Sequence, residues 1–283
     1  MNEAKDLIVR NATLEEFCVA IEWAAGEGWN PGMHDARCFY AADPNGFFLA
    51  LQNGKPAGFL SAVAYDEVFG FAGFYMVKPE LRGQGIGHQL IQKASAYMGH
   101  RTIGNDAVVA QQENYKKYGF KMAHRNIRYR GIAPSGDIHA PEITDLRKMP
   151  FHEVTAYDRG MFPSQRSSFL NGWIHQTNGA ARGYLHNGRL SGYGVIRRCW
   201  QGYKIGPLFA DHEEIAEQLL LALTGVVSGE EFFLDIPEPN SGARAFIYRY
   251  KMQMVFETAR MYAGAAPSLP LGKIFGVTSF ELG

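Results

Sequence analysis

A glycine-rich stretch in the first half of the chain has the residue types and spacing of an anion-binding loop. Residues 76–88 (MVKPELRGQGIGH) place glycines at 83, 85 and 87 between a predicted strand and a predicted helix. Glycine lets the main chain turn tightly, and the amides that begin the helix point outward with the positive end of the helix dipole behind them. Such a loop binds a pyrophosphate well, although glycines after a strand also occur where the chain simply turns.

The position of this loop in the chain argues against a dinucleotide-binding β-α-β unit. Such a unit carries the loop after its first strand and an acidic residue about 20 positions later. Here three segments rich in aromatic and β-branched residues, 47–52, 57–65 and 70–77, precede the loop and are predicted to be antiparallel strands. The loop therefore belongs to another fold.

Two motifs together resemble the GNAT acetyltransferases. Arg82, Gly85 and Gly87 fill that family's coenzyme A pattern, which is Arg or Gln, two residues, Gly, one residue, and Gly or Ala. Residues 114–120 (NYKKYGF) resemble the family's Tyr, three residues, Gly-Phe motif, with Tyr115 at the tyrosine position. The motifs stand in the family's order, with a helix and a strand between them. The joint match is far more specific than either motif alone.

The resemblance implies an acetyl-coenzyme A site and a set of residue roles. The main-chain amide of Met76 or Val77 would donate to the thioester carbonyl. Tyr115 would protonate the departing thiolate, unless it is a helix tyrosine that only packs on the sheet. Asn114 would hold pantetheine or cap a turn. The residues expected at the cofactor are Met76, Val77, Arg82, Gly83, Gln84, Gly85, Ile86, Gly87, His88, Asn114 and Tyr115.

The base that removes the acceptor's proton is the least defined part of the predicted site. The family often has a glutamate early on its fourth strand, but residues 69–77 contain none. Asp66 and Glu67 lie just upstream, where they are either candidates for the base or exposed hairpin residues; a water relay is an equal alternative. Glu27, His34 and Asp35 flank a Gly-Trp-Asn-Pro-Gly loop in the region where the family builds its acceptor pocket. Their carboxylates would suit a cationic amine, unless the loop only fixes the chain.

The elements that position these residues predict an α+β protein with two tandem GNAT-like domains, each a mixed, mainly antiparallel twisted sheet flanked by helices. The predicted divisions are residues 1–132, a linker at 133–142 and residues 143–283. The second half repeats the element order but lacks the glycine triplet, and Asp211, Glu213 and Glu214 would repel a pyrophosphate there. A final strand is predicted at 273–283, where Thr278 and Glu281 either pack or line the acceptor cleft.

Composition narrows the class of protein. The 283 residues include 28 Lys plus Arg and 28 Asp plus Glu, so no global positive field favours nucleic acid. No apolar run long enough for a membrane span or secretory signal is present, and three distant cysteines indicate reduced thiols, so we expect a cytoplasmic protein without a membrane partner. None of the nine histidines has a metal-ligand partner at a useful spacing, so no metal is expected.

The sequence therefore predicts an N-acetyltransferase that moves acetyl from acetyl-CoA to a primary amine, most readily of a small molecule, in a ternary complex. The alternatives are a protein lysine or N-terminal acetyltransferase with a peptide acceptor, and a non-catalytic coenzyme A-binding module. The partner is thus a small-molecule amine or a peptide, and the protein is expected to be a monomer or a homodimer. One functional site per chain is expected.

Overall fold

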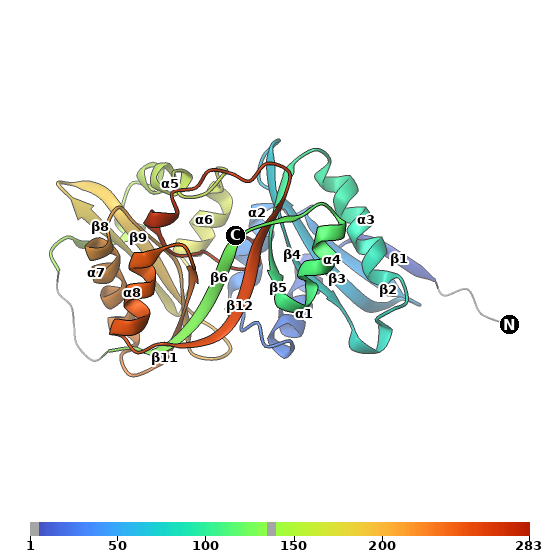
Figure 1. Ribbon diagram of the computed structural model, residues 1–283, viewed down its shortest axis with the longest axis horizontal. Helices are drawn as coiled ribbons and strands as arrows, with labels where there is room; N and C mark the ends of the chain where they lie inside the picture. The colour runs from blue at the N-terminus through green and yellow to red at the C-terminus, as the bar shows by residue number, and fades with distance from the viewer. Residues whose placement is uncertain (1–5, 135–139) are drawn as a thin grey trace.

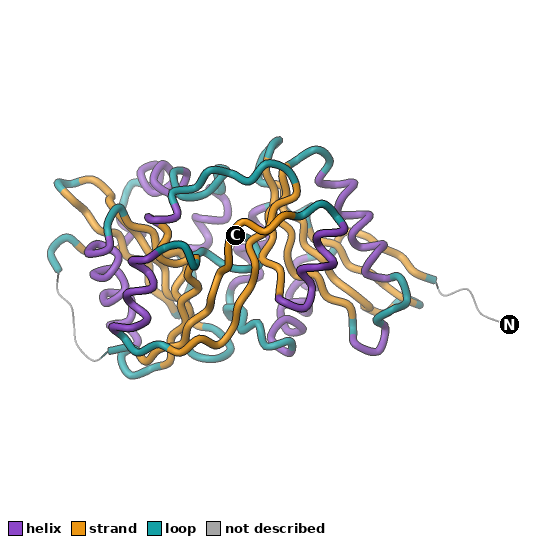
Figure 2. The backbone as a smooth tube through the Cα atoms, in the orientation of Figure 1, coloured by secondary structure: helices purple, strands orange, loops and turns teal. Residues whose placement is uncertain are grey.

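A single mixed sheet joins the two halves of the chain in the computed structural model, which describes residues 6–134 and 140–283. The strands follow one another through the middle of the molecule, and helices lie on both sides of them (Figure 2). In Figure 1 the elements of the first half lie mainly on the right and those of the second half on the left, with two long strands crossing the middle. The predicted α+β class with two repeated units is confirmed.

The first half begins with a strand and a well-capped helix. The Thr13 hydroxyl accepts a hydrogen bond from the Glu16 amide, and the Glu16 carboxylate accepts one from the Thr13 amide, which fixes the start of the helix. The elements of this half are β1 (Leu7–Asn11), α1 (Leu14–Gly26), α2 (Asp35–Ala42), β2 (Phe47–Gln52), β3 (Lys55–Ala64), β4 (Phe69–Val77), the short η1 (Pro79–Leu81), α3 (Ile86–Met98), β5 (Thr102–Val108), η2 (Val109–Gln111), α4 (Gln112–Lys117) and β6 (Lys121–Ile132).

The second half repeats this order of elements, as the sequence predicts. Its elements are β7 (Ile143–Asp145), η3 (Leu146–Lys148), α5 (Phe151–Arg159), α6 (Ser167–Ile174), β8 (Gly179–His186), β9 (Arg189–Arg198), β10 (Tyr203–Ala210), α7 (Glu213–Thr224), η4 (Gly225–Val227), β11 (Glu231–Pro237), α8 (Ser241–Arg249), β12 (Gln253–Ala263), η5 (Leu271–Lys273) and β13 (Ile274–Gly276). The three-residue β7 is too short to give a sequence signal.

The halves exchange a long strand with each other. β6 of the first half pairs antiparallel with β11, and β12 of the second half pairs antiparallel with both β5 and β6. The sheet order around the exchange is therefore β5, β12, β6, β11. The predicted division at residue 132 separates the halves in sequence, but each half is completed by a strand of the other. Of the predicted linker, residues 135–139 lie outside the described residues.

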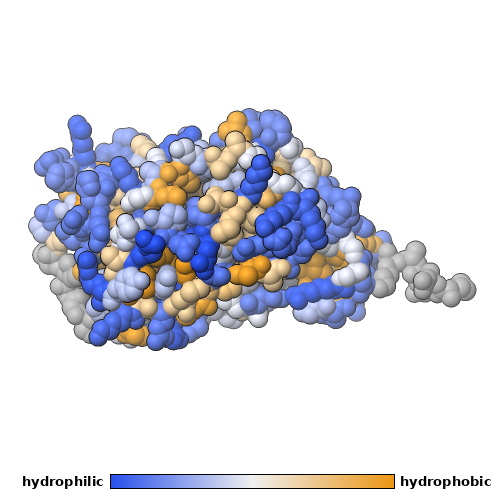
Figure 3. Space-filling view, viewed as in Figure 1, coloured by the Kyte–Doolittle hydropathy of each residue, from blue (hydrophilic) through white to orange (hydrophobic). Residues whose placement is uncertain are grey.

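The hydrophobic core is also shared between the halves. Phe39 on α2 stacks on Trp173 of α6 at 5.5 Å between ring centroids, and it also faces Phe74 of β4 at 5.9 Å. One buried cluster contains residues from α1, α2 and β4 as well as from α6, β9 and β10. Such extensive apolar burial holds the two halves as one body. The face seen in Figure 3 is hydrophilic at both ends and shows apolar patches over its middle.

The predicted final strand at 273–283 is wrong beyond residue 276. Only Ile274–Gly276 form a strand, β13, which pairs antiparallel with β10. Residues 277–283 are all buried but run as turns and loop between the halves, where they satisfy their polar groups through specific bonds such as Val277 amide to Asp235 carbonyl. The apolar pattern therefore reflects burial on all sides rather than a sheet. We call residues 274–283 the plug segment.

Candidate active site

An open groove surrounds the glycine loop. β4 and β5 pair in parallel only over Phe69–Ala72 and Thr102–Asn105, and then diverge toward the loop. The opening has a cavity volume of about 510 Å³. Its lining residues are Glu27, Trp29, Tyr75, Met76, Val77, Leu81, Arg82, Gly83, Gly85, Ile86, Gly87, His88, Val108, Ala110 and Gln111. We call this opening the loop groove.

The loop presents donors to the groove. Gly83 and Gly85 have φ of 77° and 85°, a left-handed conformation that favours glycine. Gly85 caps α3 without a side chain that bonds to the first amides of the helix, so these amides stay free for an anion. Arg82 donates through Nε to the Val77 carbonyl at 3.0 Å and through Nη2 to Glu27 at 2.8 Å. The arrangement suits a pyrophosphate.

A bulge in β4 exposes main-chain donors beside the groove. Phe59 faces Met76 and Ser61 faces Gly73, so Phe74 and Tyr75 share one partner position on β3. Phe74 takes φ of 48°, which is uncommon for a bulky residue and is held here by buried aromatic packing against Phe17 and Phe39.

The direction of the amides along β4 selects one of the two predicted oxyanion donors. The Lys78 amide bonds to Ala57 on β3, and successive amides of a strand alternate in direction. The Val77 amide therefore points to the open side of β4, whereas the Met76 amide faces β3. Because Arg82 bonds to the Val77 carbonyl, that open side is the side of the loop groove.

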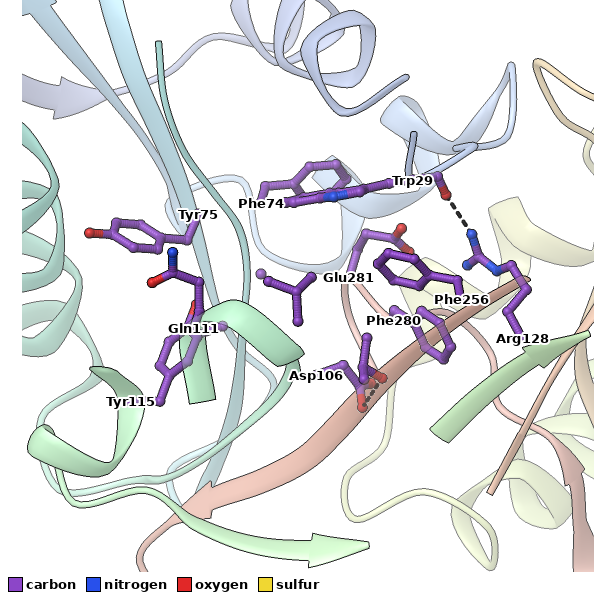
Figure 4. A pocket seen from close by; sticks show the side chains of 14 residues that line it. Trp29, Phe74, Tyr75, Asp106, Gln111, Tyr115, Arg128, Phe256, Phe280 and Glu281 are labelled. Carbon is purple, nitrogen blue, oxygen red and sulfur yellow. Dashed lines mark hydrogen bonds between the residues drawn. The ribbon is translucent and has the colours of Figure 1, made fainter. Parts of the chain in front are cut away.

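A second, smaller pocket lies at the inner end of the groove. Trp29, Tyr75, Val108 and Gln111 line both openings. Its cavity volume is only about 60 Å³, enough for a few waters. In Figure 4, Tyr75, Gln111 and Tyr115 lie on one side and Phe256, Phe280 and Glu281 on the other. The lining is completed by Ala72, Gly73, Phe74, Asp106, Arg128 and Thr258. We call it the aromatic pocket.

Tyr115 lines the aromatic pocket beside Tyr75, which lines both openings. Its ring is half-buried and contacts those of Tyr75 and Phe120 edge-on, at 6.4 and 5.5 Å between centroids. Burial, with a smaller effect of Tyr75, raises the pKa of Tyr115 well above that of a free phenol. The hydroxyl therefore keeps its proton at neutral pH and can donate a hydrogen bond to a leaving sulfur. Complete proton transfer requires that the sulfur be desolvated as well.

Most of the residues predicted at the cofactor line the loop groove, but Gln84, Asn114 and Tyr115 do not. Gln84 is exposed and bonds to the Glu80 carbonyl and the Gln52 side chain. Asn114 is also exposed, and its side chain bonds to Gln111 and Lys117 along α4. The residue of this region that reaches both openings is Gln111, which the sequence did not single out.

The residues predicted for the base and for the acceptor pocket do not come together in one site. Glu67 has 89% of its side chain exposed beside Arg101, on the hairpin before β4, and lines neither opening. Glu27 lies in the loop groove, paired with Arg82. His34 is exposed. Asp35 is buried against Arg197 at 2.9 Å, so it joins the two halves rather than meeting an acceptor.

In the described part of the second half, a strand occupies the place that corresponds to the loop groove. β10 and β11 also begin in parallel and diverge, but β13 fills the gap by pairing with β10 at Leu208. A Cβ on Gly276 would lie 2.7 Å from Leu234, which shows how tightly β13 fits. The turn into α7 carries Asp211, whose carboxylate is bound by Lys273 at 3.0 Å. Steric filling thus adds to the charge argument made from the sequence.

Two features outside these openings concern metals and membranes. Among the described residues, no three His, Cys, Asp or Glu side chains are grouped to hold a metal ion. No helix in the described ranges is long and apolar enough to cross a membrane.

Comparison with known proteins identifies the family. The acetyltransferase (GNAT) family profile matches residues 14–120, and an acetyltransferase (GNAT) domain profile matches residues 154–276. The chain is 32% identical over 291 aligned positions to the holothin acyltransferase of Pseudoalteromonas sp. (strain SANK 73390), covering 100% of this chain and 97% of that protein.

Solved structures share the fold over nearly the whole chain. A putative acetyltransferase from Pyrococcus horikoshii superposes with a TM-score of 0.83 at 23% identity, covering 98% of this chain and 96% of that one. A tandem GNAT protein from the clavulanic acid biosynthesis pathway superposes with a TM-score of 0.63 at 15% identity, covering 93% and 100%. From the two matched domains and the full-length relative, the chain belongs to the GNAT acyltransferases, as a member with two GNAT domains.

Proposed function

We propose that this acyltransferase uses acetyl-CoA and transfers the acetyl group to the primary amine of a small molecule by direct attack in a ternary complex. The observation that carries the proposal is the junction of the two openings. Trp29, Tyr75, Val108 and Gln111 line both the loop groove and the aromatic pocket. A coenzyme A with its pyrophosphate on the α3 amides would therefore present its thioester where a molecule in the aromatic pocket can reach it.

The chain's own groups can meet the demands of the reaction at this junction. The Val77 amide faces the open side of β4, where a thioester oxygen gains negative charge as the amine attacks. One well-placed donor of this kind contributes about 3 to 4 kcal/mol. Tyr115 offers its proton to the sulfur as the C–S bond breaks. The amine loses its protons as the amide forms, so the net products are an amide, the coenzyme A thiol and a proton.

The size of the aromatic pocket supports a compact acceptor. Its cavity volume is about 60 Å³, compared with about 510 Å³ for the loop groove. Residues of the second half, Phe256, Thr258, Phe280 and Glu281, form one wall and close the pocket on that side. A peptide acceptor needs an extended surface for its main chain on either side of the reacting residue, so the pocket favours a small amine over a protein.

The acyl group is proposed as acetyl, with longer groups as a variable of the test. The Pseudoalteromonas relative is named a holothin acyltransferase, and this name leaves the acyl group open.

The proposal is tested by release of free thiol from acetyl-, propionyl- and butyryl-CoA in the presence of a panel of amines, amino acids, polyamines and peptides. We expect amine-dependent release with small amines, and an acyl group on the acceptor nitrogen by mass spectrometry. Gly85→Glu, which places a carboxylate at the loop, should abolish release. Release only with peptides would favour the protein acetyltransferase, and coenzyme A binding without any release would favour a binding module.

A further inference from the structure

One buried carboxylate in the aromatic pocket has no direct hydrogen-bond or ion-pair partner among the described residues. Glu281 is 5% exposed, and among the described residues it makes no hydrogen bond or ion pair. The other carboxylate of the pocket, Asp106, is occupied, because it accepts two hydrogen bonds from Arg260 at 3.1 and 2.7 Å and one from Asn126 at 2.7 Å. Buried glutamates are ordinarily in direct contact with a donor, so one that lacks such a contact and faces a cavity can take its donor from a ligand.

The plug segment holds Glu281 rigidly in this position. The first part of the segment is β13, which pairs with β10 in the cleft between β10 and β11. The segment then crosses to the first half, where Tyr65 donates to the Leu282 carbonyl at 2.9 Å. The Leu282 amide donates to Ser279 at 3.0 Å. A Cβ on Gly73 would lie 2.1 Å from the Glu281 carbonyl oxygen, so the segment passes directly over β4 beside the bulge. Glu281 thus reaches the strand whose amides flank the groove.

The side chains behind the pocket include more basic than acidic groups. Arg128 is paired with both oxygens of Asp235 at 2.6 and 2.7 Å, and Arg197 is paired with Asp35. Lys204 is buried and donates to the Asn30 carbonyl, without a carboxylate within ion-pairing distance in the described part of the chain. Three cations therefore face two aspartates, and Glu281 is the third carboxylate beside them.

The rest of the pocket wall suits a cation with an apolar body. Rings of Trp29, Phe74, Phe256 and Phe280 surround the space that Glu281 faces (Figure 4). Aromatic faces attract ammonium groups, and they exclude the water that would otherwise solvate the charges.

We propose that Glu281 binds the acceptor as its ammonium ion and receives the first proton from it, which makes the preferred substrate a small, aliphatic primary amine with an apolar body. The proposal rests on the acyltransferase function proposed above. The N–H bond of the ammonium breaks, its electron pair stays on nitrogen, and the proton moves to a Glu281 oxygen. Exclusion of water assists this step, because burial disfavours both charged partners. The neutral nitrogen then attacks the thioester, and Glu281 later returns its proton to solvent.

Two acceptors of similar size separate this role from a structural one. Benzylamine is largely protonated at pH 7.5, so only a small fraction is neutral, whereas aniline is already neutral at that pH. Glu281→Gln keeps the size of the side chain but cannot take up the proton. We expect kcat/KM for benzylamine to fall by about 10²- to 10⁴-fold, and that for aniline to change by only a few-fold.

The controls test folding and the cofactor site. Affinity for acetyl-CoA should be unchanged in Glu281→Gln, since Glu281 does not line the loop groove. Glu22→Gln makes the same chemical change at an exposed position of α1, outside both openings, and should leave the rates with both acceptors unaffected. If Glu281→Gln does not bind acetyl-CoA, the two acceptors are compared in Glu281→Asp instead. This variant keeps the carboxylate but moves it back by one methylene.

Each outcome decides a different claim. An equal loss with both acceptors, or no loss with either, would overturn the role of Glu281 while leaving amine acylation by the wild-type protein intact. Absence of amine-dependent thiol release from the wild-type protein would instead contradict the proposed function, and this inference with it.

Discussion

The buried pair between Asp35 and Arg197 provides a sharp separation of stability from catalysis. Asp35 accepts hydrogen bonds from Arg197 at 2.9 and 3.3 Å, from the Gly32 amide at 2.8 Å and from Gln176 at 3.3 Å. Both charged side chains are at most 1% exposed, and the guanidinium lies 4.3 Å from the centre of the Trp173 ring. Asp35→Asn keeps the size of the side chain but removes the charge that compensates Arg197.

The expected loss follows from the burial of the pair. Removing one partner of a buried ion pair leaves the other charge without compensation, which destabilises a protein by about 3 to 5 kcal/mol. Asparagine retains an oxygen for the Gly32 amide, so the lower end, about 3 kcal/mol, is the better expectation. Since total stabilities are about 5 to 15 kcal/mol, such a loss is readily measured.

The assay is urea unfolding at 25 °C, combined with turnover under conditions where the variant is still folded. We expect a lower midpoint with an unchanged slope, and near-normal kcat/KM for the best amine. In the double variant with Arg197→Met the loss should be smaller than the sum of the single losses, because the unpaired cation is gone. A variant with an unchanged midpoint but abolished turnover would refute this reasoning. It would instead support the role in acceptor binding that the sequence suggested for Asp35.

Three further predictions concern the groove, the leaving group and pH. Gly87→Ala places a Cβ 2.2 Å from the Tyr75 hydroxyl and should weaken acetyl-CoA binding by about tenfold in calorimetry, with partial recovery on adding Tyr75→Phe. Tyr115→Phe should lower kcat by about 10²-fold while the dissociation constant of acetyl-CoA stays the same; an unchanged kcat would exclude donation to the sulfur. Burial, then Arg260, lowers the pKa of His124 to about 4, against about 6.5 when unfolded. The unfolded chain therefore binds more protons between these values, and stability falls as pH drops through this window. His124→Gln should lose about 2 kcal/mol less than the wild type between pH 7 and 5 in urea unfolding, and equal losses would contradict the assignment.

The sequence predicted the local elements well because their signals are local. The strand at Phe47–Gln52 has the predicted bounds, and the helix predicted after the glycine loop is α3. The exchange of β6 and β12 left no such signal, because strand order depends on partners more than 100 residues away along the chain. The plug segment was mistaken for a strand because complete burial and sheet pairing favour the same apolar residues.

The candidate site divides in the same way. The glycine loop carries its own pattern, and the structure places Arg82, Gly85 and Gly87 around one groove. The acceptor side depends on residues from both halves: Trp29 and Arg128 from the first half, and Phe256 and Glu281 from the second. Glu281 was considered for the cleft from the sequence, but only its missing ion pair in the folded protein distinguishes it from a packing residue.

The central claim is a single acyl-CoA site per chain, at the glycine loop of the first half. Calorimetric titration with acetyl-CoA tests it most directly, using the wild-type protein, Gly85→Glu, and Gly272→Glu as a matched control, because Gly272 is exposed and has open space around it. We predict one molecule bound per chain in the wild type and in Gly272→Glu, and none in Gly85→Glu. Two molecules per chain, or binding that survives Gly85→Glu, would contradict the account.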